Sequence, residues 1–158
     1  MLYINNPYTD AWFNLAAEEY LLKNFSDDIF MLWQNEPSVI IGKHQNTAAE
    51  INEQFVRENG VRVVRRLSGG GAVYHDMGNL NFTFIADAGD MESINFRLFC
   101  RPVVAALAKI GVTAEINGRN DMTIDGQKFS GNSQYLKEGR VMHHGTIMFD
   151  SNLDLVAQ

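Results

Sequence analysis

Two turn signals in the last third of the sequence restrict the fold more than any other feature. Asp125-Gly126 separates the short runs 122–124 and 128–130, and Glu138-Gly139 precedes the run 141–149. Asp-Gly between such runs is typical of a tight β-hairpin, whose two strands pair antiparallel. The sequence therefore predicts antiparallel strands in this region.

Helical and strand patterns alternate in the rest of the chain. Strands are predicted over 29–33, 38–42, 61–66 and 80–86, and helices over 10–24, over 93–110 and from Thr47 to just before Gly60. In 80–86, apolar residues alternate with polar ones, which predicts a strand with one buried face. Helices mixed with antiparallel hairpins indicate an α+β fold, a mixed, largely antiparallel sheet with flanking helices.

Local signals add detail to two of these helices. For 10–24, Thr9 or Asp10 is the expected N-cap, and the helical spacing predicts one buried face made of Trp12, Leu15, Ala16, Tyr20 and Leu22. Thr47 and Glu50 have capping-box spacing, which predicts a single helix there.

Composition excludes several classes of protein. With 158 residues, 46% of them hydrophobic, and no repeat or linker-like stretch, the chain is expected to form one domain. It lacks an apolar run of the roughly 20 residues that cross a bilayer, and its net charge of −6 disfavours a broad nucleic-acid surface. A single cysteine, Cys100, excludes an internal disulfide. We therefore expect a cytoplasmic protein without a membrane or nucleic-acid partner.

The segment 65–76 (RRLSGGGAVYHD) is the first candidate site. Three glycines follow a predicted strand, and such a loop brings several backbone N–H groups against anionic oxygens. Arg66 adds a planar cationic fork suited to phosphate or carboxylate; the alternative is a flexible turn beside two exposed arginines. The loop lacks the lysine of a Walker loop, and Tyr74 stands where the dinucleotide pattern requires its third glycine.

The segment 118–132 (GRNDMTIDGQKFSGN) is the second candidate site. Lys128 could neutralise a carboxylate and the charge growing on an α-phosphate, and Asp121 could help to hold Mg²⁺. The alternative is a plain type I′ turn with a solvated lysine. Further along, His143 and His144 are adjacent on a predicted strand, so they point to opposite faces and do not form a joint metal site. Cys100 is interpreted as a small core residue.

Together these segments resemble lipoate–protein ligases of the LplA type. The resemblance is carried by 65–81, 118–121, 124–132 and His143-His144-Gly145-Thr146, with support from Asn14-Leu15-Ala16-Ala17-Glu18-Glu19. It runs nearly end to end and implies the fold of the biotin and lipoate ligase catalytic domain. Ligases of this family are usually longer, so residues 1–158 are interpreted as a truncated catalytic domain without the accessory C-terminal domain.

The resemblance also implies an activity. Lipoate and ATP, with Mg²⁺, would give lipoyl-AMP, and the lipoyl group would then pass to a lysine of an acceptor domain in a 2-oxoacid dehydrogenase complex or of the glycine cleavage H protein. Two alternatives remain open: an ATP-independent octanoyl or lipoyl transferase of the same fold, which would use a cysteine nucleophile, or a ligand-binding fragment without full turnover.

Site residues follow from the resemblance position by position. Lys128 matches the catalytic lysine, which contacts both the lipoate carboxyl group and the α-phosphate. The expected ATP-binding residues are Arg66, Gly71, Ala72, Val73, Tyr74, Asn120, Asp121 and Lys128. The expected lipoate-binding residues are Ser68, Gly70, His75 and Lys128. From hydrophobicity alone, Trp33, Val73 and Phe82 are candidates to line the pocket for the dithiolane ring.

Overall fold

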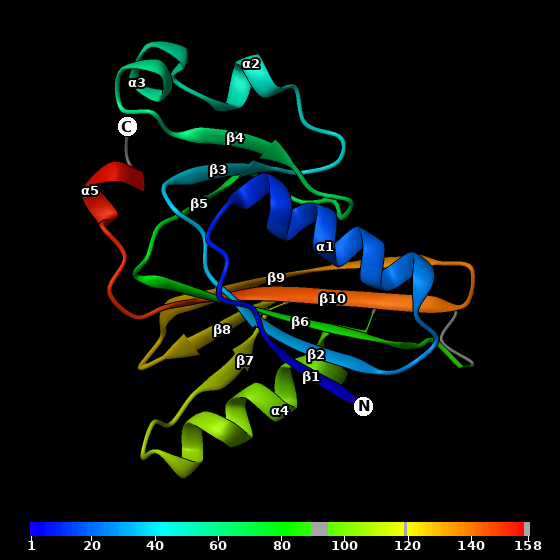
Figure 1. The fold of residues 1–158 in the computed structure, drawn as a ribbon. Helices are drawn as coiled ribbons and strands as arrows, with labels where there is room; N and C mark the ends of the chain where they lie inside the picture. Colours follow the sequence, from blue (N-terminus) through cyan, green and yellow to red (C-terminus); the bar gives the residue numbers. More distant parts are fainter. Residues whose placement is uncertain (90–94, 119, 157–158) are drawn as a thin grey trace.

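The chain folds into two β-sheets with helices between and around them (Figure 1), as described by a computed structural model for residues 1–89, 95–118 and 120–156. The large sheet has seven strands in the order β1-β2-β6-β10-β9-β8-β7. Their bounds in chain order are β1 (Leu2–Asn5), β2 (Ile29–Trp33), β6 (Asn79–Asp87), β7 (Glu115–Asn117), β8 (Asp121–Ile124), β9 (Gln127–Lys137) and β10 (Arg140–Met148). The small sheet has the order β4-β3-β5, with β3 (Ser38–Ile41), β4 (Arg62–Arg65) and β5 (Val73–His75).

Antiparallel pairing dominates the large sheet, while the small sheet has one parallel and one antiparallel pair. In the large sheet only β1 and β2 are parallel, and in the small sheet only β3 and β4 are. The predicted α+β fold is therefore confirmed. Both predicted turns are also present, because Asp125 and Gly126 have φ of 50° and 76°, and Glu138 and Gly139 have 52° and 75°. Positive φ at both central residues is the signature of a type I′ hairpin.

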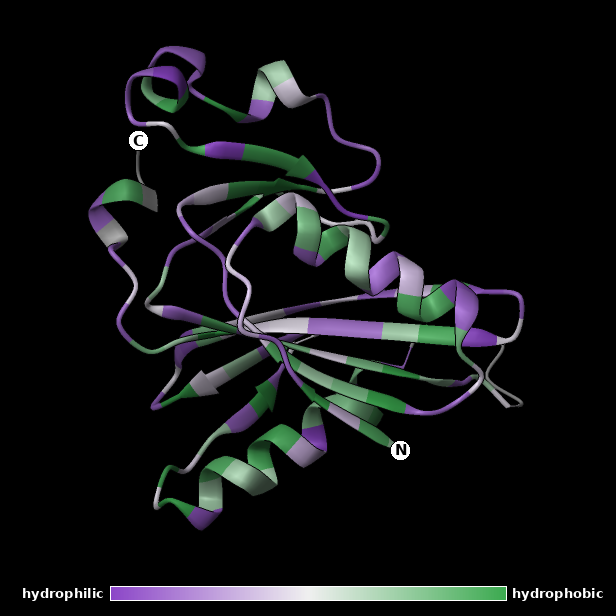
Figure 2. Cartoon of the chain, in the orientation of Figure 1, coloured by the Kyte–Doolittle hydropathy of each residue, from purple (hydrophilic) through white to green (hydrophobic). Residues whose placement is uncertain are grey.

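Helix α1 (Ala11–Asn24) forms the layer between the two sheets, and α4 (Phe96–Lys109) covers the opposite face of the large sheet. The remaining helices are the short α2 (Thr47–Glu50), α3 (Glu53–Glu58) and α5 (Leu153–Val156). Within the described part of the chain, no helix is long and apolar enough to span a bilayer. In Figure 2, β1 and β2 are largely hydrophobic, while β10, which contains His143 and His144, carries a hydrophilic stretch.

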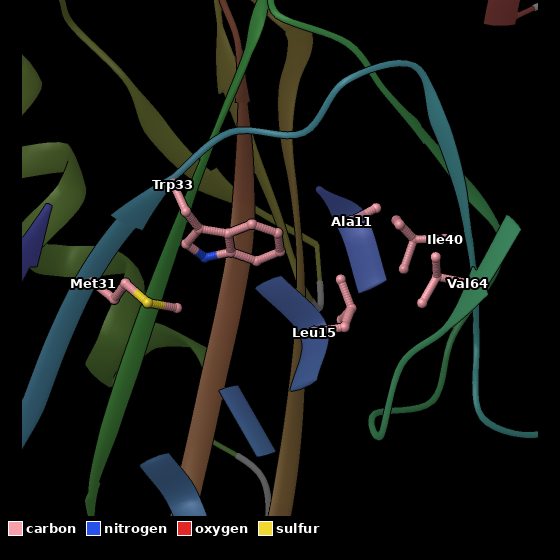
Figure 3. Packing of buried hydrophobic residues seen from close by; sticks show 6 residues of the cluster. All are labelled: Ala11, Leu15, Met31, Trp33, Ile40 and Val64. Atoms are coloured by element: carbon pink, nitrogen blue, oxygen red, sulfur yellow. The ribbon is translucent and has the colours of Figure 1, made fainter. Parts of the chain in front are cut away.

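The contact between α1 and the two sheets is an apolar cluster (Figure 3). Leu15 of α1 lies between Trp33 of β2 on one side and Ile40 and Val64 of the small sheet on the other. The N-terminus of the helix is capped by Asp10, whose side chain accepts a hydrogen bond of 2.8 Å from the backbone N–H of Phe13. This cluster fixes the small sheet over the large one.

The buried face of α1 differs from the predicted one. Leu15 and Leu22 are buried as expected, but Trp12 is 57% exposed and Tyr20 is 60% exposed. The polar residues Asn14 and Glu18 take their places inside. A buried carboxylate requires hydrogen-bonding partners. The partners of Glu18 lie on the large sheet, and the periodicity of the helix alone does not indicate them.

Strand β6 also departs from its prediction. Its polar residues Asn79, Asn81 and Thr83 are as buried as Phe82, so the strand has two buried faces rather than one. The reason is that α1 and α4 cover opposite faces of this central strand. The sequence pattern identified the two faces correctly but not the layer over the polar one.

The predicted helix after Thr47 is split into α2 and α3. Asn52 interrupts it and caps α3 by accepting from Phe55 N–H at 3.1 Å. The predicted capping box is wrong, because α2 is preceded by Asn46 and the Thr47 hydroxyl accepts from Arg65 Nη2 at 2.7 Å. The predicted start of the later helix at Ser93 lies outside the described residues.

Candidate functional site

A cavity of about 490 Å³ opens where the glycine-rich segment meets β9 and β10. One wall is apolar and is made by Leu15, Trp33, Ile40 and Val73. Another wall is polar and carries the side chains of Asn120, Lys128, Asn132 and Thr146. A molecule that combines an apolar chain with an anionic group matches this division.

The glycine-rich segment forms a loop along the cavity, and its carbonyl groups are tied down by the surrounding chain. Arg66 Nη2 donates to Gly69 O at 2.9 Å and to Gly71 O at 2.7 Å. Across a trans peptide the N–H points away from the C=O. The N–H groups of Gly70 and Ala72 are therefore directed away from the guanidinium, in a loop that lines the cavity. Such a run of backbone N–H groups suits an anion.

Close packing against β3 holds the same loop. A Cβ atom at Gly42 would lie 2.0 Å from Gly70 O, so only glycine fits there. Lys43 N donates to Ser68 O at 2.9 Å, and Ser133 Oγ donates to Gly69 O at 2.8 Å. The loop is therefore fixed from three sides rather than flexible, which argues against the plain-turn interpretation.

Arg66 is buried, although the sequence predicted a contact with phosphate. Its four hydrogen bonds go to the chain's own atoms, including Ile40 O at 3.0 Å and Ser68 Oγ at 3.2 Å. Burial lowers the pKa of the guanidinium, and the charge of Glu18 opposes that effect. Arg66 reaches the cavity lining, but most of its hydrogen-bonding capacity organises the loop.

Lys128 lies on β9 and lines the cavity, with its side chain 52% exposed. Its Nζ is 2.9 Å from Asp121 Oδ1 on the neighbouring strand β8. Beside this pair, Asn120 Nδ2 donates to Asn132 O at 2.8 Å, and Asn132 Nδ2 donates to Asn120 O at 2.9 Å. The hairpin thus brings one cation and two amides to the polar wall.

His75 lines the cavity from β5 and is buried beside Trp33, with ring centroids 6.2 Å apart. Its Nδ1 lies 3.1 Å from Asn35 Nδ2, which donates because Asn35 Oδ1 already accepts from Asn14. The ring proton is therefore on Nε2. Burial, then the nearby charges of His144 and Arg66, lower the pKa of His75 to about 3, so the ring is neutral at pH 7.

Most of the predicted site residues lie together, but three do not reach the cavity. The cavity is lined by Arg66, Gly70, Gly71, Ala72, Val73, His75, Asn120 and Lys128. Ser68, Tyr74 and Asp121 lie beside the lining rather than in it. Trp33 and Val73 line the apolar wall as expected, whereas Phe82 is buried in the core beneath Gly145. Arg119 of the second motif lies outside the described residues.

The two adjacent histidines point to opposite faces, as predicted. His143 stacks on Phe99 at a centroid distance of 5.2 Å, under α4. His144 faces α1 and lines the cavity, and its Nδ1 lies 3.0 Å from Glu18 Oε1. Its Nε2 lies 2.6 Å from Ser68 Oγ. The predicted site did not include Glu18 and His144, which meet across 126 residues of sequence.

Cys100 is a buried core residue on α4 and does not reach the cavity. Burial raises the pKa of its thiol to about 11. A thiol without appreciable thiolate is a poor nucleophile. This environment agrees with the predicted core role of Cys100.

Metal-binding side chains are sparse around the cavity. In residues 1–89, 95–118 and 120–156, no three His, Cys, Asp or Glu side chains gather as they would in a dedicated metal site. Asp121 is a single carboxylate next to Lys128. One carboxylate is sufficient for Mg²⁺ when substrate phosphates supply further oxygens, so the donor set fits an ion that arrives with a nucleotide.

Curated relatives match nearly all of this chain but only part of their own length. Lipoate-protein ligase LplJ of Bacillus subtilis (strain 168) is 54% identical over 99% of the chain and 48% of its own length. Lipoate–protein ligase 1 of Staphylococcus aureus is 48% identical over 96% of the chain and 47% of its own length. The chain therefore spans about half the length of these relatives.

Solved structures with the same fold include ligand complexes. P. falciparum LipL1, solved in complex with lipoate, superposes with a TM-score of 0.90 at 34% identity and covers 99% of this chain and 50% of its own. A bi-partite lipoate protein ligase of Thermoplasma acidophilum, described with its E2 lipoyl domain, has a TM-score of 0.92 at 29% identity over 99% and 64% of the two chains. A lipoate-protein ligase A bound with ATP has a TM-score of 0.85 at 25% identity, over 99% of this chain and 70% of its own.

A model of the lipoyl protein ligase A/B catalytic domain matches residues 10–158, which include every residue of the cavity wall. The match agrees with the fold described above. The chain belongs to the lipoyl protein ligase A/B catalytic domain family.

Proposed function

We propose that this chain binds lipoate and ATP in the cavity and joins them to form lipoyl-AMP. The observation that carries the proposal is a cavity that combines an apolar wall, a lysine and the glycine loop. The apolar wall suits the hydrocarbon chain and ring of lipoate, while the polar wall suits the carboxylate and the α-phosphate. The relatives named lipoate-protein ligases, and the ATP-bound neighbour, support this assignment.

In the first step, a carboxylate oxygen of lipoate attacks the α-phosphorus of ATP. The new P–O bond replaces the bond to the leaving pyrophosphate, and a mixed anhydride, lipoyl-AMP, remains. Two anions must approach each other, so a cation between them lowers the barrier. Lys128 is the proposed cation, and the N–H groups of the glycine loop would fix the geometry. Mg²⁺ carried by ATP, with Asp121 beside it, would supply further charge neutralisation.

In the second step, the amine of an acceptor lysine attacks the acyl carbon of lipoyl-AMP. AMP leaves, the amine loses a proton, and an amide forms without an enzyme nucleophile. We propose a lipoyl-acceptor domain of a 2-oxoacid dehydrogenase complex or the glycine cleavage H protein as the acceptor. The E2 lipoyl domain in the description of the archaeal neighbour supports this class of partner.

The test separates binding from turnover, because the curated relatives are about twice as long as this chain. Calorimetric titration with ATP, lipoate and lipoyl-AMP measures binding, and we expect saturable binding of all three. Release of pyrophosphate that depends on lipoate measures the first step. A mass increase of a purified acceptor domain measures the second.

The outcomes distinguish this proposal from its alternatives. Absence of binding for all three ligands would refute it. Transfer from an acylated carrier protein without ATP would identify a transferase instead, although the buried Cys100 does not favour one. Binding without pyrophosphate release would restrict the function of this chain to ligand binding.

A further inference from the structure

A chain of buried hydrogen bonds connects helix α1 to the glycine loop. Glu18 on α1 contacts His144 Nδ1 through both carboxylate oxygens, at 3.0 and 3.1 Å. His144 Nε2 lies 2.6 Å from Ser68 Oγ, which lies 3.2 Å from Arg66 Nε. Glu18 is 1% exposed and Ser68 is completely buried. Water therefore does not compete for these bonds, and each one is stronger than at the surface.

The direction of each bond follows from its chemistry. Arg66 Nε can only donate, so the Ser68 hydroxyl accepts there and directs its own proton to His144 Nε2. The ring proton of His144 is then on Nδ1, where it is donated to Glu18. One arrangement of protons satisfies every member, so the chain specifies a single geometry.

The other side of Glu18 is anchored as well. Trp33 Nε1, which can only donate, bonds Thr83 Oγ1 at 2.8 Å, so the Thr83 hydroxyl donates to Glu18 Oε1 at 2.5 Å. The carboxylate is thus held from the apolar wall of the cavity on one side and from His144 on the other. Its orientation is fixed by β6 and β10 of the large sheet and not by the rotamers of α1 alone.

Glu18 also acts on Arg66 through its charge. Arg66 is buried, and the charge of Glu18 is the acidic influence that favours the cationic guanidinium over its neutral form. Glu18, which does not line the cavity, therefore favours the charged form of the residue that holds Gly69 O and Gly71 O.

The arrangement of Ser68, His144 and Glu18 has the order of a serine, histidine and acid triad. A nucleophilic serine must reach its substrate, but Ser68 does not line the cavity and receives a hydrogen bond from Arg66. The geometry therefore fits support of the loop and does not fit covalent catalysis.

We propose that Glu18 and His144 are positioning residues, which act through Ser68 and Arg66 to hold the glycine loop in its anion-binding conformation. The inference rests on the proposed function only where it predicts a weaker affinity for ATP. Its structural part, the rigidity of residues 69–72, is measurable without any ligand.

The test compares Glu18→Gln with Glu19→Gln. Both variants remove one negative charge from α1, but Glu19 is paired with Lys23 on the surface. In ¹⁵N relaxation of the ligand-free chain, we expect the order parameters of amides 69–72 to fall from about 0.85 toward 0.6 in Glu18→Gln only. We expect the dissociation constant for ATP to rise about tenfold, as for the weakening of one charge-assisted hydrogen bond.

A second variant, Ser68→Ala, cuts the same chain by deleting one hydroxyl, and it replaces Glu18→Gln if that variant does not fold. We expect the loop of Ser68→Ala to loosen equally, and the double variant to be no looser than either single one. Unchanged order parameters in either folded variant, or effects that multiply in the double variant, would overturn the inference. A loosened loop in a chain whose wild type binds no ATP would refute the proposed function alone.

Discussion

Replacing Arg66 by lysine tests whether this residue serves the fold of the loop or only its ligand. Lysine keeps the positive charge, but it has a single nitrogen in place of a planar fork. It cannot reach Ile40 O, Gly69 O and Gly71 O together, although Arg66 bonds all three. We therefore expect at least two of these three hydrogen bonds to be lost.

The expected loss of stability follows from these bonds. A hydrogen bond to a charged group contributes about 1.5 kcal/mol or more, so two lost bonds lower the free energy of unfolding by about 3 kcal/mol. At roughly 2–4 °C per kcal/mol for a chain of this size, Tm falls by about 6–12 °C. Urea unfolding followed by circular dichroism measures the change as a lower midpoint at an unchanged slope.

Arg65→Lys is the matched control. Arg65 also bonds three carbonyl groups, those of Gly42, Lys43 and Gln45, but it is exposed, so water replaces what the lysine cannot reach. We expect a loss below about 1 kcal/mol for this surface site. Equal midpoints for Arg66→Lys and wild type would refute the structural role of Arg66.

Four further predictions follow. Lys128→Ala should lower lipoate-dependent pyrophosphate release at least about a hundredfold. Its Tm should stay nearly constant, because the half-exposed ion pair of Lys128 with Asp121 contributes at most about 1 kcal/mol. Full activity of the variant would contradict the proposed role of Lys128. Cys100, whose pKa burial raises to about 11, should react with a thiol reagent at pH 7 only as fast as the chain unfolds, and Cys100→Ala should retain pyrophosphate release. Burial lowers the pKa of His75 and of His143 to about 3 from 6.5. As the pH drops below about 6.5, the unfolded chain therefore takes up protons that the folded chain does not, and the free energy of unfolding falls by about 2 kcal/mol for each histidine between pH 7 and 5. Urea midpoints at the two pH values measure this loss, and a constant midpoint would contradict it. Gly42→Ala should displace the glycine loop and weaken ATP binding in calorimetry, whereas unchanged affinity would show that the close contact yields easily.

The hairpins were predictable from sequence because their information is local. Asp125-Gly126 and Glu138-Gly139 each require two consecutive residues with positive φ, which few residue types adopt. That residues 69–71 form a loop was predictable for a similar reason, since consecutive glycines lack Cβ atoms and favour a turn or loop, while the anion-binding role of this loop stays a prediction.

The supporting contacts of the site were not predictable from periodicity. Glu18 occupies a helix position that a polar residue normally exposes, and only its partners Thr83 and His144, on other elements, make its burial favourable. The same holds for β6, where Asn79, Asn81 and Thr83 look like a solvent face in the sequence but are all buried, Thr83 against Glu18 of α1. Contacts across more than 60 residues carry no signal in a single sequence.

The place of β10 in the sheet has a consequence for the order of folding. Among the strands of the described residues this one is the last in sequence, yet it pairs with both β6 and β9 inside the large sheet. During synthesis β6 and β9 therefore lack this neighbour until the segment 140–148 has been made. Loop closure over such distances is slow. His144 arrives with that segment, so Ser68 gains its partner only when the sheet is complete. A nascent chain would consequently acquire an ordered glycine loop late, after its main sheet has closed.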